Sequence, residues 1–191
     1  MKDLKKIPLN MVKEMKSIIK NGGIDALEES GCLDFLMSAN GYEDAFDCGN
    51  HCYLTYNQQI IGEIDFHIGK PQRNEENALV FFDEISQEAF DLWYDCLKDS
   101  NRHRHQILQT KFVFLSEMNI HPELRNLGFE ALMLSNFERL MKSLKVRQIY
   151  LVSSQCVEEE TIAHQFYQKM NYKPFKKMGV NKEYYVMFKR L

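Results

Sequence analysis

The stretch of residues 111–144 constrains the fold of this chain most, because its hydrophobic period changes partway along. From Phe112 to Ile120, apolar residues recur at every second position with one interruption at Ser116, which predicts a β-strand. His121-Pro122 follows, and we expect the strand to end there because proline cannot donate to a ladder. Beyond it, apolar residues recur at the spacing of a helix with one buried face: Phe129, Met133, Phe137, Leu140, Met141 and Leu144.

The turn between this strand and this helix has the composition of an anion site. It contains Arg125 and Gly128 within a short polar segment. The free N–H groups at the start of a helix point toward a ligand, and the helix dipole favours negative charge. Glycine lets the backbone approach that ligand closely. We therefore predict that the turn holds an anionic group.

Two blocks of the sequence resemble the GNAT superfamily of acyl-CoA-dependent N-acyltransferases. The first reads Arg125-Asn126-Leu127-Gly128-Phe129-Glu130 and is similar to the family's phosphate loop, Arg/Gln-x-x-Gly-x-Gly/Ala, at its first two anchors. The second, residues 163–172, reads AHQFYQKMNY and resembles the family's Ala-x-x-Leu-Tyr-x-x-x-Gly-Phe. The resemblance covers residues 111–191 well and the N-terminal half in outline.

The resemblance implies both a fold and a reaction. The fold would be an α/β sandwich with a mixed, mostly antiparallel central sheet flanked by helices, in a single domain over residues 1–191. A helical insertion at residues 70–108 would precede the central strand. The reaction would transfer an acetyl group from acetyl-CoA to an unidentified primary amine of a small molecule or a peptide. The sequence identifies neither that amine nor the acyl length.

The same resemblance assigns residues to the cofactor. Backbone N–H groups of the turn would hold the pyrophosphate, and the end of the preceding strand would bind the pantetheine arm through main-chain bonds. The residues assigned to coenzyme A in this way are Met118, Asn119, Ile120, Arg125, Asn126, Leu127, Gly128, Phe129, Glu130 and Ala131.

Tyr167 is the candidate general acid. The family places its proton donor for the departing thiolate at this tyrosine. Ala163, Phe166 and Met170 recur at i, i+3 and i+7 and are expected to face the core, with Tyr167 at the edge of that stripe. The alternative is a packed core tyrosine with a satisfied hydroxyl.

Glu117 is the candidate base for the amine, acting directly or through water. It interrupts a face that is otherwise apolar at Val113 and Leu115, where desolvation would raise the pKa of its carboxyl. The alternatives are an ion pair or a solvated strand end. His121 is a weaker candidate, because a histidine next to proline is typical of a turn.

Two acidic residues depart from the family pattern. Glu130 occupies the position of Gly or Ala in the phosphate loop, and Glu160 replaces an Asn that often precedes the second block. Both favour a rival hypothesis, an acyl-CoA-binding or partner-binding protein without catalysis. A third hypothesis is an interaction module built on the inserted helix around Trp93. That insertion could shape the acceptor site, form a homodimer face or be decoration.

Charge and cysteine content exclude other classes. The net charge of −3 comes without a long basic block, which argues against nucleic-acid binding. No run approaches ~20 apolar residues, so no membrane span is expected. Five cysteines, an odd number, and the lack of an apolar run of signal length predict a reduced, cytoplasmic protein.

No metal is expected from the sequence. Cys48, His51 and Cys52 form the one metal-like cluster, and no second Cys/His pair with matching spacing supplies the four ligands of a structural zinc site. The nearby residues 52–67 predict a hairpin whose second strand has one polar face, with Glu63, Asp65 and His67. That face is either solvated or lines an amine cleft.

The remaining patterns predict the other elements. We expect helices over residues 11–19 and 24–38, ended by Gly22-Gly23 and broken near Gly31 respectively. Further along we expect a buried strand at residues 148–152, parallel to the strand before the central helix. A helix that begins near Glu158 should follow it, and a pair of strands at residues 172–178 and 184–189 should close the sheet.

Overall fold

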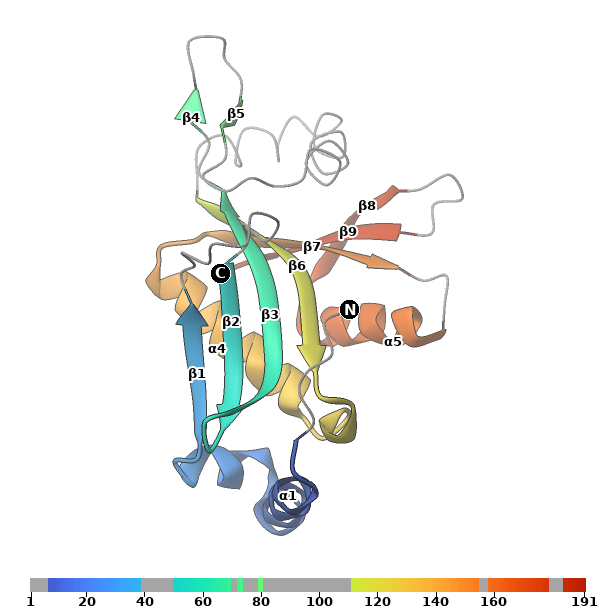
Figure 1. Ribbon diagram of the computed structural model, residues 1–191. Helices are drawn as coiled ribbons and strands as arrows, with labels where there is room; N and C mark the ends of the chain where they lie inside the picture. The colour runs from blue at the N-terminus through green and yellow to red at the C-terminus, as the bar shows by residue number, and fades with distance from the viewer. Residues whose placement is uncertain are drawn as a thin grey trace. The chain divides into compact units, whose positions relative to one another are not determined.

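The computed structural model describes residues 7–38, 50–69, 72–73, 79–80, 111–154, 158–178 and 184–191. Figure 1 shows the elements in chain order. The helices are α1 (Leu9–Glu29), the 3-10 turn η1 (Pro122–Leu124), α4 (Phe129–Ser143) and α5 (Glu158–Lys169). The strands are β1 (Leu33–Ser38), β2 (Asn50–Tyr56), β3 (Gln59–Gly69), β4 (Gln72–Arg73), β5 (Leu79–Val80), β6 (Phe112–Ile120), β7 (Gln148–Ser154), β8 (Lys173–Met178) and β9 (Tyr184–Arg190).

Seven of these strands form one sheet, with the hydrogen-bonded order β1-β2-β3-β6-β7-β9-β8. β1 pairs with β2, β7 with β9, and β8 with β9, all antiparallel. β6 and β7 form a parallel pair from Phe112 opposite Gln148 to Leu115 opposite Leu151. The expected mixed, mostly antiparallel sheet with flanking helices is therefore confirmed, as is the parallel strand after the central helix.

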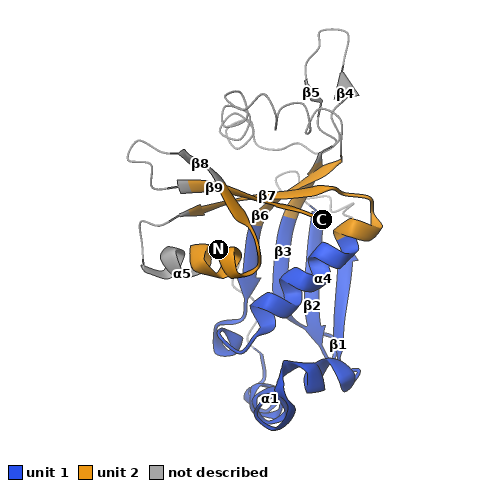
Figure 2. Ribbon diagram, turned by 180° about the vertical axis from the view of Figure 1, so that it is seen from behind, with its two compact units in different colours: residues 1–41, 50–65, 117–140 blue, residues 42–49, 66–116, 141–191 orange. Residues whose placement is uncertain are grey.

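The chain divides into two compact units, shown in Figure 2. Unit 1 consists of residues 1–41, 50–65 and 117–140. Unit 2 consists of residues 42–49, 66–116 and 141–191. The expectation of one domain over residues 1–191 stays a prediction.

In unit 1, α4 covers one face of the strands (Figure 2). Its buried residues Phe129, Met133 and Phe137 lie on the predicted stripe. Gly62 on β3 shows how close the contact is, since a Cβ there would lie 2.8 Å from the Met133 sulfur and 2.6 Å from Cδ1 of Ile120. Alanine at position 62 would therefore force the side chains of Met133 and Ile120 to shift. The predicted strand and helix of residues 111–144 are both confirmed.

The helix break expected at Gly22-Gly23 is present in the N-terminal segment. Within α1, Gly23 has the non-helical angles φ 75° and ψ −174° and separates two helical parts by a kink. Gly31, with φ 70°, lies just beyond the helix end, and the chain then enters β1. The expected helix over residues 24–38 is wrong from Leu33 onward, because these residues pair with β2 instead.

The predicted hairpin is confirmed as β2 and β3. Asn57 and Gln58 connect the strands with φ values of 48° and 65°, the left-handed pair that matches the twist of a tight hairpin. The expected alternation of faces holds only in part. Ile61 and Glu63 are buried although they lie on the nominally polar face, and Ile60 on the other face is exposed.

Unit 2 contains the antiparallel set β7-β9-β8 and the helix α5, both as predicted. The α5 residue His164 lies against β9, with its ring centroid 4.8 Å from that of Tyr185. Of the expected insertion at residues 70–108, the structure describes only the short pair of β4 and β5. The predicted helix around Trp93 lies outside the described residues.

Candidate functional site

The turn that joins β6 to α4 is fixed by local hydrogen bonds. The imidazole of His121 caps the start of the 3-10 turn η1, because its Nδ1 accepts from the Glu123 N–H at 3.3 Å. Burial lowers the pKa of His121, and the positive charge of Arg125 lowers it further, while the negative charge of Glu123 raises it. The net lowering favours the neutral imidazole, which can accept this hydrogen bond. The interpretation of His121 as a turn residue is confirmed.

Two residues of this turn have left-handed backbone angles. Asn126 has φ 62° and Gly128 has φ 96°. A Cβ at Gly128 would meet only Ile24, at 3.7 Å, which is an ordinary contact. Glycine is therefore favoured at position 128 by the backbone angle and not by crowding. The Gly128 carbonyl accepts the first bond of α4, from the Leu132 N–H at 3.0 Å.

A carboxylate already binds an amide of this turn. Oε1 of Glu130 accepts a hydrogen bond from the Asn126 N–H at 2.9 Å. The carboxylate also lies in the first turn of α4, where the helix dipole favours negative charge. Glu130 thus points back onto the turn, and the side-chain oxygen occupies one of the N–H groups predicted to hold an anion.

Arg125 supplies the positive charge of the turn. Its side chain is exposed, and Nε donates to the Ile120 carbonyl at 3.3 Å. This bond ties the guanidinium to the end of β6. The terminal N–H groups of an arginine held in this way can serve an anion.

The end of β6 contains the residues assigned to the pantetheine arm. Met118 and Asn119 are half-buried, and Ile120 is buried. The parallel register with β7 ends at Leu115, whereas β6 continues to Ile120. Glu117 lies in this last part of β6 and is exposed. The desolvation expected for its carboxyl is therefore absent, because the apolar face of Val113 and Leu115 does not extend as far as position 117.

Tyr167 lies in unit 2 and is more buried than predicted. Its side chain is 9% exposed, and burial raises its pKa to about 12. Its ring packs edge-on against Phe166 and Tyr172, with centroids 5.3 and 5.6 Å away. His164, one turn earlier, is also buried.

The predicted core stripe of α5 is wrong. Ala163, Phe166 and Met170 are only half-buried, whereas His164 and Tyr167 form the buried side of the helix. The segment is helical as predicted, but the apolar residues on the predicted face are less buried than His164 and Tyr167. His164 packs against Tyr185 of β9, and Tyr167 packs against Tyr172.

The structure thus brings together, within unit 1, the residues of the turn, the end of β6 and Glu117. Tyr167 belongs to unit 2. Glu160 lies in the first turn of α5, where an acidic residue suits the helix dipole. The roles assigned to these residues stay predictions.

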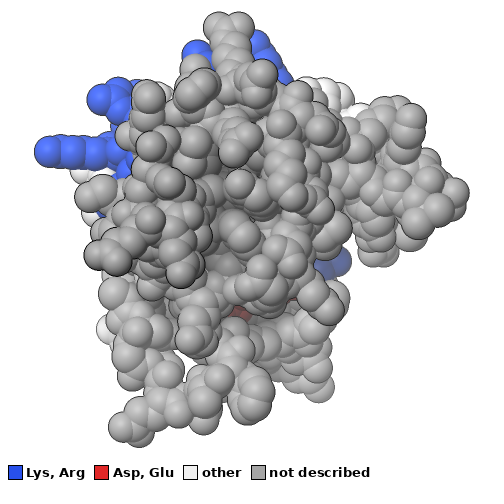
Figure 3. Space-filling model, turned by 90° about the horizontal axis from the view of Figure 1, so that it is seen from above, with Lys and Arg blue, Asp and Glu red and all other residues white. Residues whose placement is uncertain are grey.

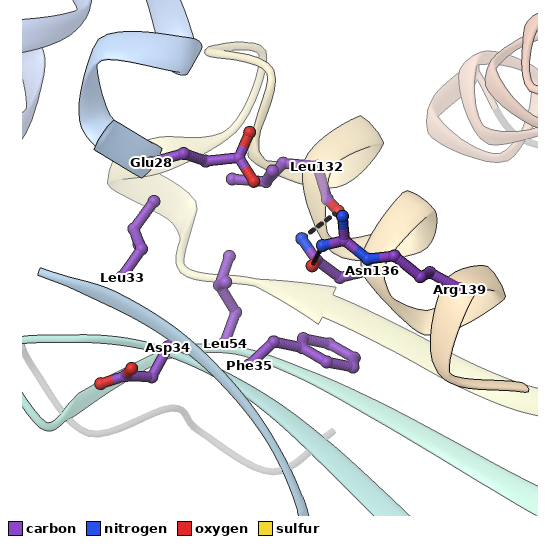
Figure 4. A pocket seen from close by; sticks show the side chains of 8 residues that line it. All are labelled: Glu28, Leu33, Asp34, Phe35, Leu54, Leu132, Asn136 and Arg139. Carbon is purple, nitrogen blue, oxygen red and sulfur yellow. Dashed lines mark hydrogen bonds between the residues drawn. The ribbon is translucent and has the colours of Figure 1, made fainter. Parts of the chain in front are cut away.

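A separate hollow in unit 1 has a volume of about 170 Å³ (Figure 4). Ligand pockets usually measure roughly 300–1,000 Å³, so this one is small for an organic substrate. Figure 4 shows Arg139 reaching back to Asn136 on α4, and its NH2 group donates to the amide oxygen of that residue. The lining residues are Glu28, Leu33, Asp34, Phe35, Leu54, Leu132, Asn136 and Arg139.

The surface view of Figure 3 shows lysine and arginine side chains in separate places at the edge of the described surface. Among the described helices, none combines the length and the apolar character that a membrane span requires.

No protein-family model matches the chain, and no curated protein matches its sequence. Solved structures resemble it at low identity. An acetyltransferase from Thermus thermophilus has a TM-score of 0.48 and 15% identity over 78% of this chain and 68% of its own. Arabidopsis thaliana NAA60 in complex with acetyl-CoA has a TM-score of 0.48 and 10% identity over 94% of this chain and 93% of its own. Arabidopsis thaliana Naa50 in complex with a bisubstrate analogue has a TM-score of 0.46 and 12% identity over 98% of this chain and 97% of its own. Because these identities are low, a function for this chain is argued from its own residues.

Proposed function

We propose that this chain is an N-acetyltransferase that moves an acetyl group from acetyl-CoA to a primary amine of a small molecule or a peptide. The observation that carries the proposal is the bond between the Asn126 N–H and the Glu130 carboxylate, at 2.9 Å. A backbone N–H of the turn before α4 donates to an anionic oxygen there, as a phosphate-binding turn must. The resemblance of residues 125–130 to the GNAT phosphate loop supports the pyrophosphate of coenzyme A as that anion.

Binding of the pyrophosphate requires Glu130 to move. The phosphate oxygens would take the Asn126 N–H, and the carboxylate would turn outward from the first turn of α4. Gly128 keeps the backbone accessible, since a Cβ is absent at a position with φ 96°. Arg125 adds a positive charge whose guanidinium is anchored at the end of β6.

The pantetheine arm would lie along β6. The parallel register with β7 ends at Leu115, and β6 continues from Ser116 to Ile120. Main-chain groups of residues 118–120 are our proposed partners for the amides of the arm. The thioester would then lie close to Glu117.

Transfer needs an acid and a base. The amine nitrogen attacks the thioester carbonyl carbon, the C–S bond breaks, and the amine loses its proton to Glu117 directly or through water. The exposed position of Glu117 favours the route through water. The departing thiolate takes the phenolic proton of Tyr167.

Burial suits Tyr167 to this role in one respect and opposes it in another. A pKa of about 12 keeps the phenol protonated at neutral pH but makes it a weaker acid.

Binding of acyl-CoA without catalysis is the second candidate function. The specific observation in its favour is also at Glu130, because a carboxylate that occupies the turn competes with the cofactor. Loss of turnover would follow if the cofactor bound in a shifted position.

Release of free thiol from acetyl-CoA across a panel of primary amines separates the two functions. We expect wild-type protein to release thiol with at least one amine. Tyr167→Phe should lower turnover about 100-fold while coenzyme A affinity is unchanged. Tyr150→Phe is the matched control, because it removes the hydroxyl of another buried tyrosine of unit 2, which donates to Gln148. Cofactor binding without thiol release for any amine would support the second candidate.

A further inference from the structure

A cluster of one imidazole and two carboxylates lies in unit 1, outside the turn between β6 and α4. His51 is on β2, and Glu63 and Asp65 are on β3. The side chains of His51 and Glu63 are 4% and 10% exposed, and that of Asp65 is 21% exposed. Ionisable groups of this kind are seldom buried together unless something satisfies their charges.

The donor atoms of the three side chains converge. Nδ1 of His51 lies 2.5 Å from Oδ1 of Asp65 and 3.4 Å from Oε1 of Glu63. All three atoms lie within 4.8 Å of one another. A single nitrogen carries at most one hydrogen, so it can make a short hydrogen bond with only one of the two oxygens at a time.

Two adjacent strands hold these atoms in place. A Cβ on Gly62 would point toward Met133 of α4, so the flanking Glu63 points to the opposite face of the sheet. The imidazole of His51 stacks on the ring of Tyr53, with centroids 6.0 Å apart and planes 14° apart. Donor atoms on strands are positioned more firmly than donor atoms on loops.

Charge and spacing both favour a divalent cation among these atoms. Two carboxylates, a neutral imidazole and a divalent cation sum to zero, so an ion would neutralise the three side chains. The 3.4 Å between Nδ1 and Oε1 is also the edge expected of a tetrahedral ion with bonds of about 2.1 Å. The contact with Asp65 is a short hydrogen bond, and the two atoms would move apart when both bind one ion.

We propose that His51, Glu63 and Asp65 form a binding site for a divalent metal ion of the zinc type. An imidazole nitrogen with carboxylate oxygens suits Zn²⁺, whereas Mg²⁺ prefers oxygen ligands alone. The ion binds Nδ1, Oε1 and Oδ1, and any hydrogen on Nδ1 leaves to solvent. Three protein ligands leave one position of a tetrahedral ion for water, and the partial exposure of Asp65 provides an entry path.

The site does not depend on acetyl transfer, because none of its three residues belongs to the proposed machinery. A titration of ZnCl₂ into metal-stripped protein without a polyhistidine tag tests it by calorimetry, with MgCl₂ as the reference salt. We expect one Zn²⁺ per chain and much weaker Mg²⁺ binding. Loss of an outer-shell group costs 10–100-fold in metal affinity, so His51→Asn, Glu63→Gln or Asp65→Asn should each cost about 100-fold or more.

Asp34→Asn is the matched control, since it removes an exposed carboxylate on the neighbouring strand β1 and should leave the affinity unchanged. Cys32 is a half-buried free thiol and could bind zinc by itself, so the titration is repeated in a Cys32→Ser background. Equal Zn²⁺ affinity in His51→Asn and wild type would overturn the site, as would no binding to wild type.

A second measurement needs no variant, in case the substituted proteins do not fold. X-ray absorption at the zinc edge of the wild-type complex should show only nitrogen and oxygen neighbours. Cobalt substitution should likewise give a visible spectrum without a thiolate charge-transfer band. Sulfur in the first coordination shell would contradict the assignment, because the three proposed ligands contain none.

Discussion

Replacing Glu130 with alanine should weaken the fold and strengthen coenzyme A binding in the same molecule. The side chain contributes a charge-assisted hydrogen bond to the Asn126 N–H and a favourable position at the start of α4. A hydrogen bond to a charged group contributes about 1.5–3 kcal/mol and a charge at a helix end about 0.3–1 kcal/mol, and partial exposure of Glu130 reduces both. We therefore expect a loss of about 1 kcal/mol in the free energy of unfolding.

The expected gain in affinity has two sources. Removal of the carboxylate frees the Asn126 N–H and removes a negative charge beside the phosphates. An exposed charge interaction is within ~1 kcal/mol, which corresponds to about a fivefold change in Kd. Glu130→Gln separates the two sources, since it removes the charge and keeps an acceptor for the amide.

Calorimetric titration with coenzyme A and thermal unfolding measure the two effects. For a chain of this size, a loss of about 1 kcal/mol lowers Tm by about 2–4 °C. Glu123→Ala is the control, because it removes another acidic residue of the same turn, one that pairs with Lys16 at 3.5 Å and does not bind Asn126. Equal or weaker coenzyme A binding in Glu130→Ala than in Glu123→Ala would refute the idea that the carboxylate occupies the phosphate position.

Three further substitutions test other parts of the site. Gly128→Val should weaken coenzyme A binding and lower Tm, because a β-branched residue with φ near 96° is strained by about 1–2 kcal/mol; unchanged affinity in a folded variant would move the phosphate site elsewhere. Arg125→Ala should weaken binding more at low than at high salt, since the lost interaction is Coulombic, and a salt-independent loss would exclude a direct charge contact. His164→Phe should make stability less sensitive to acid. Burial lowers the pKa of His164, so the folded state binds fewer protons than the unfolded state and loses stability as pH falls from about 7 toward 5. Urea titrations at both pH values should therefore show a smaller loss of unfolding free energy in the variant than in the wild type.

The strand, turn and helix of residues 111–144 could be predicted because the change of hydrophobic period is a local property. β1 could not, since its residues become a strand only by pairing with β2 across residues that the local pattern does not connect. Gly31 is recognisable as a break in the sequence, but the element beyond that break is decided by its tertiary partners.

Burial was the least predictable property of the site residues. The alternation of apolar and polar residues along β3 assigned Glu63 to the polar face. This pattern does not tell whether the polar face is exposed to solvent, and Glu63 is in fact buried. The sequence groups His51 with neighbouring cysteines, whereas its contacts lie on the next strand, Asp65 being 14 residues away. Cys52 is buried with its pKa raised to about 12 and stays a thiol, and Cys48 lies outside the described residues.

The expected role of Glu130 changed once its hydrogen bond was known. Its sequence position left open whether the carboxylate repels a phosphate or points outward, whereas the structure shows its oxygen on the Asn126 amide, which we propose for the phosphate. The cytoplasmic location and a homodimer stay predictions, as does the identity of the amine.

Titration of acetyl-CoA into the wild-type chain tests the central claim most directly. We expect saturable heat at one site per chain, together with an increase in Tm that rises with the ligand concentration. Both signals should be smaller in the Arg125→Ala variant. No heat and no increase in Tm at millimolar acetyl-CoA would contradict both the transferase and the acyl-CoA-binding function.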